Sequence, residues 1–181
     1  MTLRSATTER VRDLRDALTT MPQTRTWLAC ALVFVLFVAC AAPIGLLSDF
    51  LRPGVPNLSA KDAFSTALLI FIQPALVEEL VFRGLLLPRD ARSVRGRRLL
   101  AITGGALVIY VVSHPINAMF FRPEVLYVFD NPVYLVLAAL LGIACTVAYF
   151  ISKSIWPPVV IHWITVLTWL WFLGGRTLLH M

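Results

Sequence analysis

The sequence predicts an all-α fold, a polytopic membrane helical bundle with about five transmembrane helices. Of its 181 residues, 59% are hydrophobic and only 14% are charged, which lies outside the range of a soluble domain of this size. The alternating pattern of a membrane barrel is missing, so helices are expected to satisfy the backbone in lipid. The hydrophobic residues form five runs, each near the ~20 residues that a helical span needs: 27–47, 63–87, 99–121, 132–151 and 155–173.

These runs predict a single transmembrane domain over residues 27–175, with a basic N-terminal segment at 1–26 and a short tail at 176–181. The first run has no small-residue cleavage pattern, so we interpret it as a retained span and not as a signal peptide. The three cysteines lie inside apolar runs without Cys-x-x-Cys spacing, and we expect them to be packing residues.

The positive charges are distributed unevenly. With five spans, the N-terminal segment, the connection after the second run and Lys153 fall on one side, while the other side carries only Arg52, Lys61, Arg122 and Arg176. The positive-inside rule then predicts a cytoplasmic N-terminus, and we expect a prokaryotic plasma membrane protein. We expect the basic segments to contact anionic lipid headgroups and no nucleic acid. These segments contain Arg4, Arg10, Arg12, Arg15, Arg25, Arg89, Arg92, Arg95, Arg97 and Arg98.

Three charged residues interrupt the second run, namely Glu78, Glu79 and Arg83. An ionised group at membrane depth costs about 2.5 kcal/mol or more, so such groups usually pair and mark a site. On a helix Arg83 lies about 40° from Glu79 but about 140° from Glu78. Glu79 is therefore the predicted partner of Arg83, and Glu78 is left as a candidate general base. A purely structural charge network is the alternative. Pro74, one turn earlier, predicts a bend in this helix.

The third and fifth runs each carry a histidine. Tyr110 and His114 share a helix face, and Pro115 predicts a kink or a helix end beside His114. His162 follows the proline pair at 157–158, which suits the first turn of a helix. A histidine of this kind is by itself more often a satisfied interior residue than a catalyst. Two histidines with a free carboxylate suit activation of water, and they suit a proton relay equally well.

These motifs resemble the CAAX protease and bacteriocin-processing (CPBP, or Abi) family of intramembrane proteases. Glu-Glu-Leu-Val-Phe-Arg at 78–83 fits its Glu-Glu-x-x-x-Arg signature. Tyr110-x-x-x-His114 is similar to its Phe-x-x-x-His motif, with a different aromatic residue. Ser-Ile-Trp-Pro-Pro-Val-Val-Ile-His at 154–162 resembles the helix that carries the third-motif histidine. The resemblance extends from Ala63 to about Gly174.

The resemblance implies a glutamate-type peptidase with its site in a cavity among four core helices. Glu78 would activate water with assistance from His114, and His162 would stabilise the oxyanion. Glu79 and Arg83 would hold the helix that carries Glu78 in place and adjust the electrostatic field at the site. Two histidines and a carboxylate could in principle bind zinc, but we favour a site without metal or other cofactor.

One position departs from the family pattern. The family often has Asn four residues after the third-motif histidine, and here that position is Val166, which has no side-chain donor. Either Asn117 or Thr165 would have to replace it, or the site is weaker in this role. Asn117 follows His114 by three residues, which suits a shared helix face.

The leading hypothesis is therefore an intramembrane endopeptidase that cleaves a membrane-associated peptide or protein tail near the cytoplasmic half of the bilayer. No residue points specifically to prenyl groups. One alternative is a non-catalytic immunity or scaffold protein of the same fold, which the valine at 166 favours slightly. A proton-coupled carrier is the other alternative, although five spans without an internal repeat argue against it.

Overall fold

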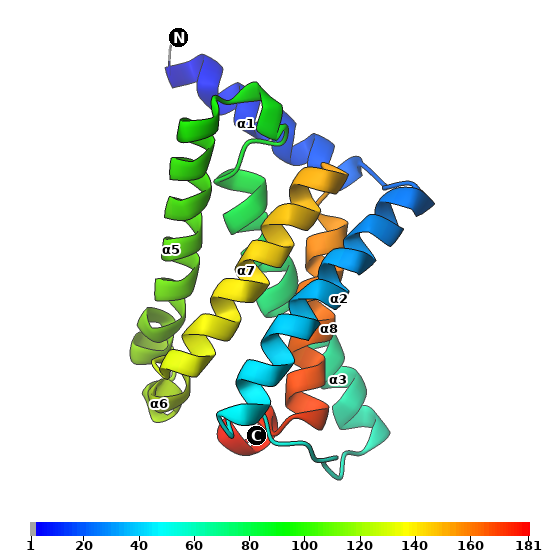
Figure 1. Cartoon of the computed structure of the whole chain (residues 1–181), viewed down its shortest axis with the longest axis vertical. Coiled ribbons are helices and arrows are strands. Elements are labelled where there is room, and N and C mark those ends of the chain that lie inside the picture. The colour runs from blue at the N-terminus through cyan, green and yellow to red at the C-terminus, as the bar shows by residue number, and fades with distance from the viewer. Residues whose placement is uncertain (1–2) are drawn as a thin grey trace.

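The computed structural model describes residues 3–181, and over these residues every regular element is a helix (Figure 1). Four of them are long and apolar enough to cross a membrane, and α8 is a shorter apolar helix of 17 residues. The predicted polytopic helical bundle is thus confirmed, and its fifth span is shorter than the 155–173 run suggested. The five rods are α2 (Thr24–Leu47), the composite rod Ala60–Leu85, α5 (Gly96–Phe121), α7 (Pro132–Ser152) and α8 (Trp156–Phe172).

The composite rod is broken in the middle. It consists of α3 (Ala60–Ile70), η1 (Phe71–Leu76), α4 (Val77–Glu79) and η2 (Leu80–Leu85). Its backbone leaves helical geometry at Gln73, with φ −135° and ψ 118°, because the residue before a proline is driven toward extended conformations. The bend predicted from Pro74 is confirmed. At Pro115 a kink or a helix end was predicted, and the helix end is wrong, since α5 continues through Pro115 to Phe121.

The N-terminal segment is more structured than its basic composition suggested. Helix α1 (Leu3–Thr19) runs across one end of the bundle (Figure 1). Its last turn and the residue after it bind the start of α8: the Ile155 amide donates to the Ala17 carbonyl at 3.1 Å, and the Ser154 hydroxyl donates to the Thr20 carbonyl at 2.7 Å. Because the side chain of Ala17 is also fully buried, α1 is a packed part of the fold.

Ion pairs and a buried cluster close this end, which we call the α1 end. Arg89 lies 3.7 Å from Asp16, and Lys153 lies 2.7 Å from Asp90. Hydrogen bonding from Lys153 and from the backbone at 92 lowers the pKa of Asp90 to about 2. Beneath these charges lies a cluster of buried side chains: Ala17, Ala75, Leu87, Ala106, Tyr149, Ile155 and Val159.

The opposite end, the far end, is built from short elements (Figure 1). Here α5 is followed by η4 (Pro123–Val125) and α6 (Leu126–Phe129), and α8 is followed by α9 (Gly175–Leu178). Gly174 has φ +83°, and a Cβ there would approach the Arg52 carbonyl oxygen to 3.2 Å. Leu179 is buried in a cluster with Phe50 and Leu170. The predicted tail is therefore part of the packed structure.

Candidate active site

The two adjacent glutamates of the composite rod have different surroundings. The Arg83 guanidinium donates to Oε1 of Glu79 at 3.0 Å, and these two side chains are only 2% and 0% exposed. Nη2 of Arg83 donates to the Gly142 carbonyl at 2.8 Å, and the guanidinium carbon lies 4.8 Å from the centre of the Tyr110 ring. The predicted Glu79–Arg83 pair is confirmed, and α7 and α5 hold the arginine in place.

The same carboxylate oxygen also binds His162. The Nδ1 atom of His162 lies 2.8 Å from Oε1 of Glu79, and its imidazole is 2% exposed. A carboxylate oxygen accepts hydrogen bonds, so Nδ1 carries the proton and Nε2 faces away from Glu79. The two residues are 83 positions apart. Sequence reasoning missed this contact, because helical spacing relates only residues within one helix.

His114 is oriented by its own helix. Its Nδ1 atom lies 2.8 Å from the Tyr110 carbonyl, which can only accept. Nδ1 therefore carries a proton here as well, and Nε2 points in the other direction. The Tyr110 ring is 1% exposed and packs edge-on against the His114 ring at 4.8 Å. Tyr110 thus fixes His114 through both its carbonyl and its ring, which is a more specific contact than the shared helix face predicted from spacing.

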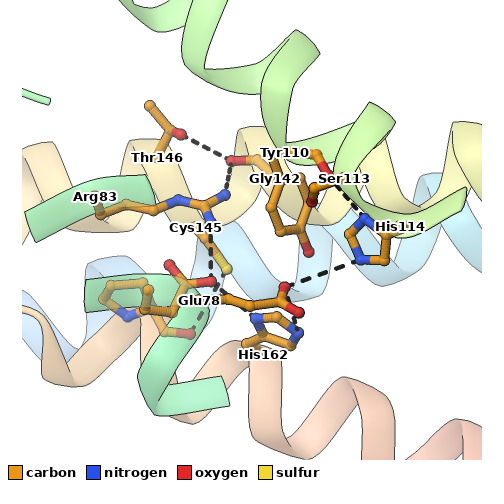
Figure 2. Close-up of polar contacts among 11 residues, drawn as sticks. Glu78, Arg83, Tyr110, Ser113, His114, Gly142, Cys145, Thr146 and His162 are labelled. Atoms are coloured by element: carbon orange, nitrogen blue, oxygen red, sulfur yellow. Dashed lines mark hydrogen bonds and ion pairs between the residues drawn. The ribbon is translucent and has the colours of Figure 1, made fainter. Parts of the chain in front are cut away.

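Glu78 lies between the two imidazoles, as Figure 2 shows. Its Oε2 atom is 3.9 Å from Nε2 of His114 and 4.0 Å from Nε2 of His162. These separations exceed hydrogen-bond length, and this oxygen is buried without a partner among the described residues. One water molecule would lie within hydrogen-bond reach of the carboxylate and an imidazole together. The carboxylate predicted to be uncommitted is uncommitted in the structure.

Glu78, His114 and His162 line one cavity of about 580 Å³. The other residues that line it are mainly aliphatic and aromatic. Glu79 and Arg83 are not among its lining residues and lie behind it. Asn117 also lines the cavity, is exposed, and makes no side-chain hydrogen bond within residues 10–181.

Asn117 and Thr165, the two possible replacements for the asparagine missing at position 166, differ in their contacts. Val166 does line the cavity, as does Thr165. The Thr165 hydroxyl donates to the Ile161 carbonyl at 2.8 Å. Its single proton is therefore bound within its own helix and is not available to an oxyanion in the cavity. Asn117 therefore remains the cavity residue with a free amide on the helix of His114.

Gln73 is a further cavity residue that sequence reasoning missed. It is exposed, and it occupies the non-helical position at the bend. The signal was present in the sequence, since Gln73 precedes Pro74, but a break in a helix does not show which way its side chain will point. Over the described residues, no group of three or more His, Cys, Asp or Glu side chains is arranged to hold a metal ion.

Comparison with known proteins found one family match. The family model for type II CAAX prenyl endopeptidase Rce1-like proteins matches residues 60–168. That segment contains the composite rod, α5 and all of α8 except its last four residues. No curated protein and no solved structure matches the chain. Because the family match covers more than half of the sequence and includes the whole charged cluster, the chain belongs to the Rce1-like family of type II CAAX prenyl endopeptidases.

Proposed function

We propose that this protein is an intramembrane endopeptidase of the glutamate type, with Glu78 as its general base. One observation carries the proposal: the unpaired Oε2 of Glu78 faces the Nε2 atoms of two separately oriented histidines at the inner end of an apolar cavity. A carboxylate without a fixed partner and within one water of an imidazole has the geometry that general-base activation of water requires. Membership of an endopeptidase family supports the same reaction class.

In this mechanism Glu78 takes a proton from the water while the water oxygen bonds to the scissile carbonyl carbon. The Nε2 lone pair of neutral His114 accepts the other hydrogen bond from that water and orients it. The carbonyl π electrons move to its oxygen, which forms the tetrahedral oxyanion. The C–N bond then breaks, and the Glu78 carboxyl returns its proton to the leaving amine. The products are one amine and one carboxylic acid, which keeps the second proton of the water and then loses it to the amine or to solvent.

His162 and Asn117 are the proposed oxyanion donors. His162 is held by Glu79 through Nδ1, so in its protonated form Nε2 donates toward the cavity while the Glu79 carboxylate stabilises the imidazolium. Arg83 keeps Glu79 in place through their ion pair. The Asn117 amide supplies the second donor that Val166 lacks, because Thr165 donates to its own helix.

The proposed substrate is a membrane-associated peptide or protein tail. Most lining residues are apolar, which favours a hydrophobic segment over a charged one. A prenyl group is one apolar chain that such a cavity could receive, and a hydrophobic sorting tail is another. The family description names prenyl endopeptidases, so prenylated peptides belong in the first substrate panel.

The test is a comparison of peptide termini in cells that express the wild-type protein or Glu78→Gln, read by mass spectrometry. Glu124→Gln is the matched control, since it makes the same chemical change at an exposed carboxylate that does not line the cavity. Precursors that accumulate uncut only with Glu78→Gln support the peptidase. Identical termini at equal protein levels would refute it and favour a scaffold, whereas an altered pH dependence of ion flux would favour a carrier.

A further inference from the structure

We infer that the hydroxyl of Tyr110 is a further catalytic group, which donates a hydrogen bond to the attacking water between Glu78 and His114. This role rests on the proposed peptidase function, since it concerns the water that the peptidase would use. It is distinct from the contacts through which Tyr110 fixes His114, because those contacts use the backbone carbonyl and the aromatic ring.

The first observation is that the Tyr110 ring is held on several sides. It packs edge-on against the Phe82 ring, with 5.1 Å between the ring centres. The guanidinium carbon of Arg83 lies 4.8 Å from its centre, and a Cβ at Gly142 would approach the ring to 3.1 Å. Tyr110 as a whole is 1% exposed. A ring that is packed in this way has little room to move, so the position of its hydroxyl oxygen is fixed.

The second observation is that this ring lies beside the proposed water site. Its centre is 4.8 Å from that of the His114 ring and 6.4 Å from that of the His162 ring. Oε2 of Glu78 lies between the same two imidazoles, 3.9 Å and 4.0 Å from their Nε2 atoms. Tyr110 lines the cavity together with these three residues. Figure 2 shows its hydroxyl turned toward Glu78 and His114.

The third observation is that the Tyr110 hydroxyl has no hydrogen-bond partner among the described residues. The side-chain hydrogen bonds at Tyr110 use its backbone carbonyl, which accepts from the Ser113 hydroxyl and from His114. A buried tyrosine hydroxyl usually finds a partner, because a polar group withheld from both water and protein costs free energy. A water between Glu78 and His114 would be that partner.

The attacking water has one position left for this donor. In the proposed mechanism its two protons face Glu78 and the Nε2 lone pair of His114, and one of its own lone pairs bonds to the scissile carbonyl carbon. The second lone pair can accept a hydrogen bond. A phenol keeps its proton at physiological pH and can donate it. Tyr110 would thus complete the tetrahedral set of partners and fix the direction of attack. It transfers no proton, so the balance of hydrolysis is unchanged.

A second tyrosine, Tyr134, also lines the cavity. Its ring centre lies 5.5 Å from that of His114, and it also contacts Phe129 and Trp169, which belong to the buried cluster at the far end. Tyr110 instead packs against two residues of the rod that carries Glu78, and its ring lies near both histidines. We therefore assign the role to Tyr110.

Tyr110→Phe tests the role, because it removes only the hydroxyl oxygen and keeps the ring that packs against His114. Tyr149→Phe is the matched control. Tyr149 is 0% exposed, its hydroxyl is buried without a partner among the described residues, and it lies in the cluster at the α1 end and not in the cavity. The substrate is the precursor that accumulates with Glu78→Gln, supplied as a synthetic peptide to the purified protein in detergent.

Tyr110→Phe should lower kcat roughly tenfold, as the loss of one neutral hydrogen bond does. KM should stay within a few-fold, because the hydroxyl binds the water and not the substrate. The Tm should not fall, since the hydroxyl has no protein partner to lose, and Tyr149→Phe should keep the wild-type kcat. An unchanged kcat in Tyr110→Phe would overturn the inference. A lower Tm or loss of the protein would show a structural role and overturn it too, as would a loss of kcat confined to Tyr134→Phe.

The role of Tyr110 and the peptidase function can fail separately. If Glu78→Gln leaves all peptide termini unchanged, the peptidase is refuted and the water site with it. If Glu78→Gln blocks cleavage while Tyr110→Phe cleaves at the wild-type rate, the peptidase stands and the role of Tyr110 fails.

Discussion

The buried Glu79–Arg83 pair offers a quantitative test of the charged cluster. Replacing Arg83 with Met removes one charge and leaves the other carboxylate fully buried, with His162 as its remaining partner. Breaking a buried pair by removing one partner typically costs about 3–5 kcal/mol. We therefore expect Arg83→Met to lower the free energy of unfolding by about that amount, and Glu79→Met to do the same.

The double variant is the informative one. Removing both charges leaves no uncompensated ion, so the large penalty disappears. What remains is the loss of donors and acceptors for the Gly142 carbonyl and for His162, at about 1–3 kcal/mol for each group that stays unsatisfied. Since the Thr146 hydroxyl also donates to the Gly142 carbonyl at 2.8 Å, that group keeps a partner. The double variant should therefore be more stable than either single variant.

An exposed ion pair shows whether burial, and not the distance between the charged atoms, causes the loss of stability. Arg122 and Glu124 are closer, at 2.6 Å, but their side chains are 50% and 56% exposed. Arg122→Met should cost no more than about 1 kcal/mol, because solvent screens an exposed pair. The assay is equilibrium unfolding in mixed micelles of a mild detergent and SDS. A double variant no more stable than the singles, or equal losses at Arg83 and Arg122, would refute the reasoning from burial.

Three further predictions concern cavity, packing and pH. Asn117→Leu should slow cleavage by about 100-fold, because it removes one proposed oxyanion donor. Thr165→Val should keep the rate within a few-fold of the wild-type rate. Both rates are measured as product formation. The Cβ of Gly142→Ala would come within 2.6 Å of Leu107 Cδ1 and 3.1 Å of the Tyr110 ring, which contacts His114. A shift of that ring by a few tenths of an ångström should slow cleavage roughly fivefold, scaled from about 100-fold per ångström of misplacement. The control Gly104→Ala meets nothing within 4 Å and should not slow cleavage. Asp90 has a pKa lowered from 3.8 to about 2, so its contribution to stability is present above the unfolded value and lost as the pH falls through about 2. The Tm difference from Asp90→Asn should shrink over that window, and a constant difference would contradict the assignment.

The fold was largely predictable because lipid imposes a length and a composition on each span. The five apolar runs correspond to five apolar helices, within a few residues at most ends. Helix α1 escaped prediction because Ala17 and the polar residues around it carry no strong hydrophobic signal, and its partners at 154–156 become neighbours only in the folded state. The helix does not end at Pro115, because a proline removes one hydrogen bond but need not end a long helix.

The site was predictable where its geometry is local. The fourfold spacing of Glu79 and Arg83 fixes their pairing, and the same angular argument leaves Glu78 free. The contact of His162 with Glu79 depends instead on how α8 packs against the composite rod, and the use of the Gly142 carbonyl depends on α7. Helical periodicity carries no information on either. The roles of Glu78, His114 and His162 in catalysis remain predictions for the experiments above.

The docking of α1 also sets an order of assembly. The Thr20 and Leu18 carbonyls receive their hydrogen bonds from Ser154 and the Trp156 indole, which lie 134 and 138 residues later in the chain. Helix α1 therefore completes these contacts only after the start of α8 has been synthesised. Until then the composite rod lacks His162 beside Glu79. A chain that stalls before α8 thus holds the Glu79–Arg83 pair without its histidine partner.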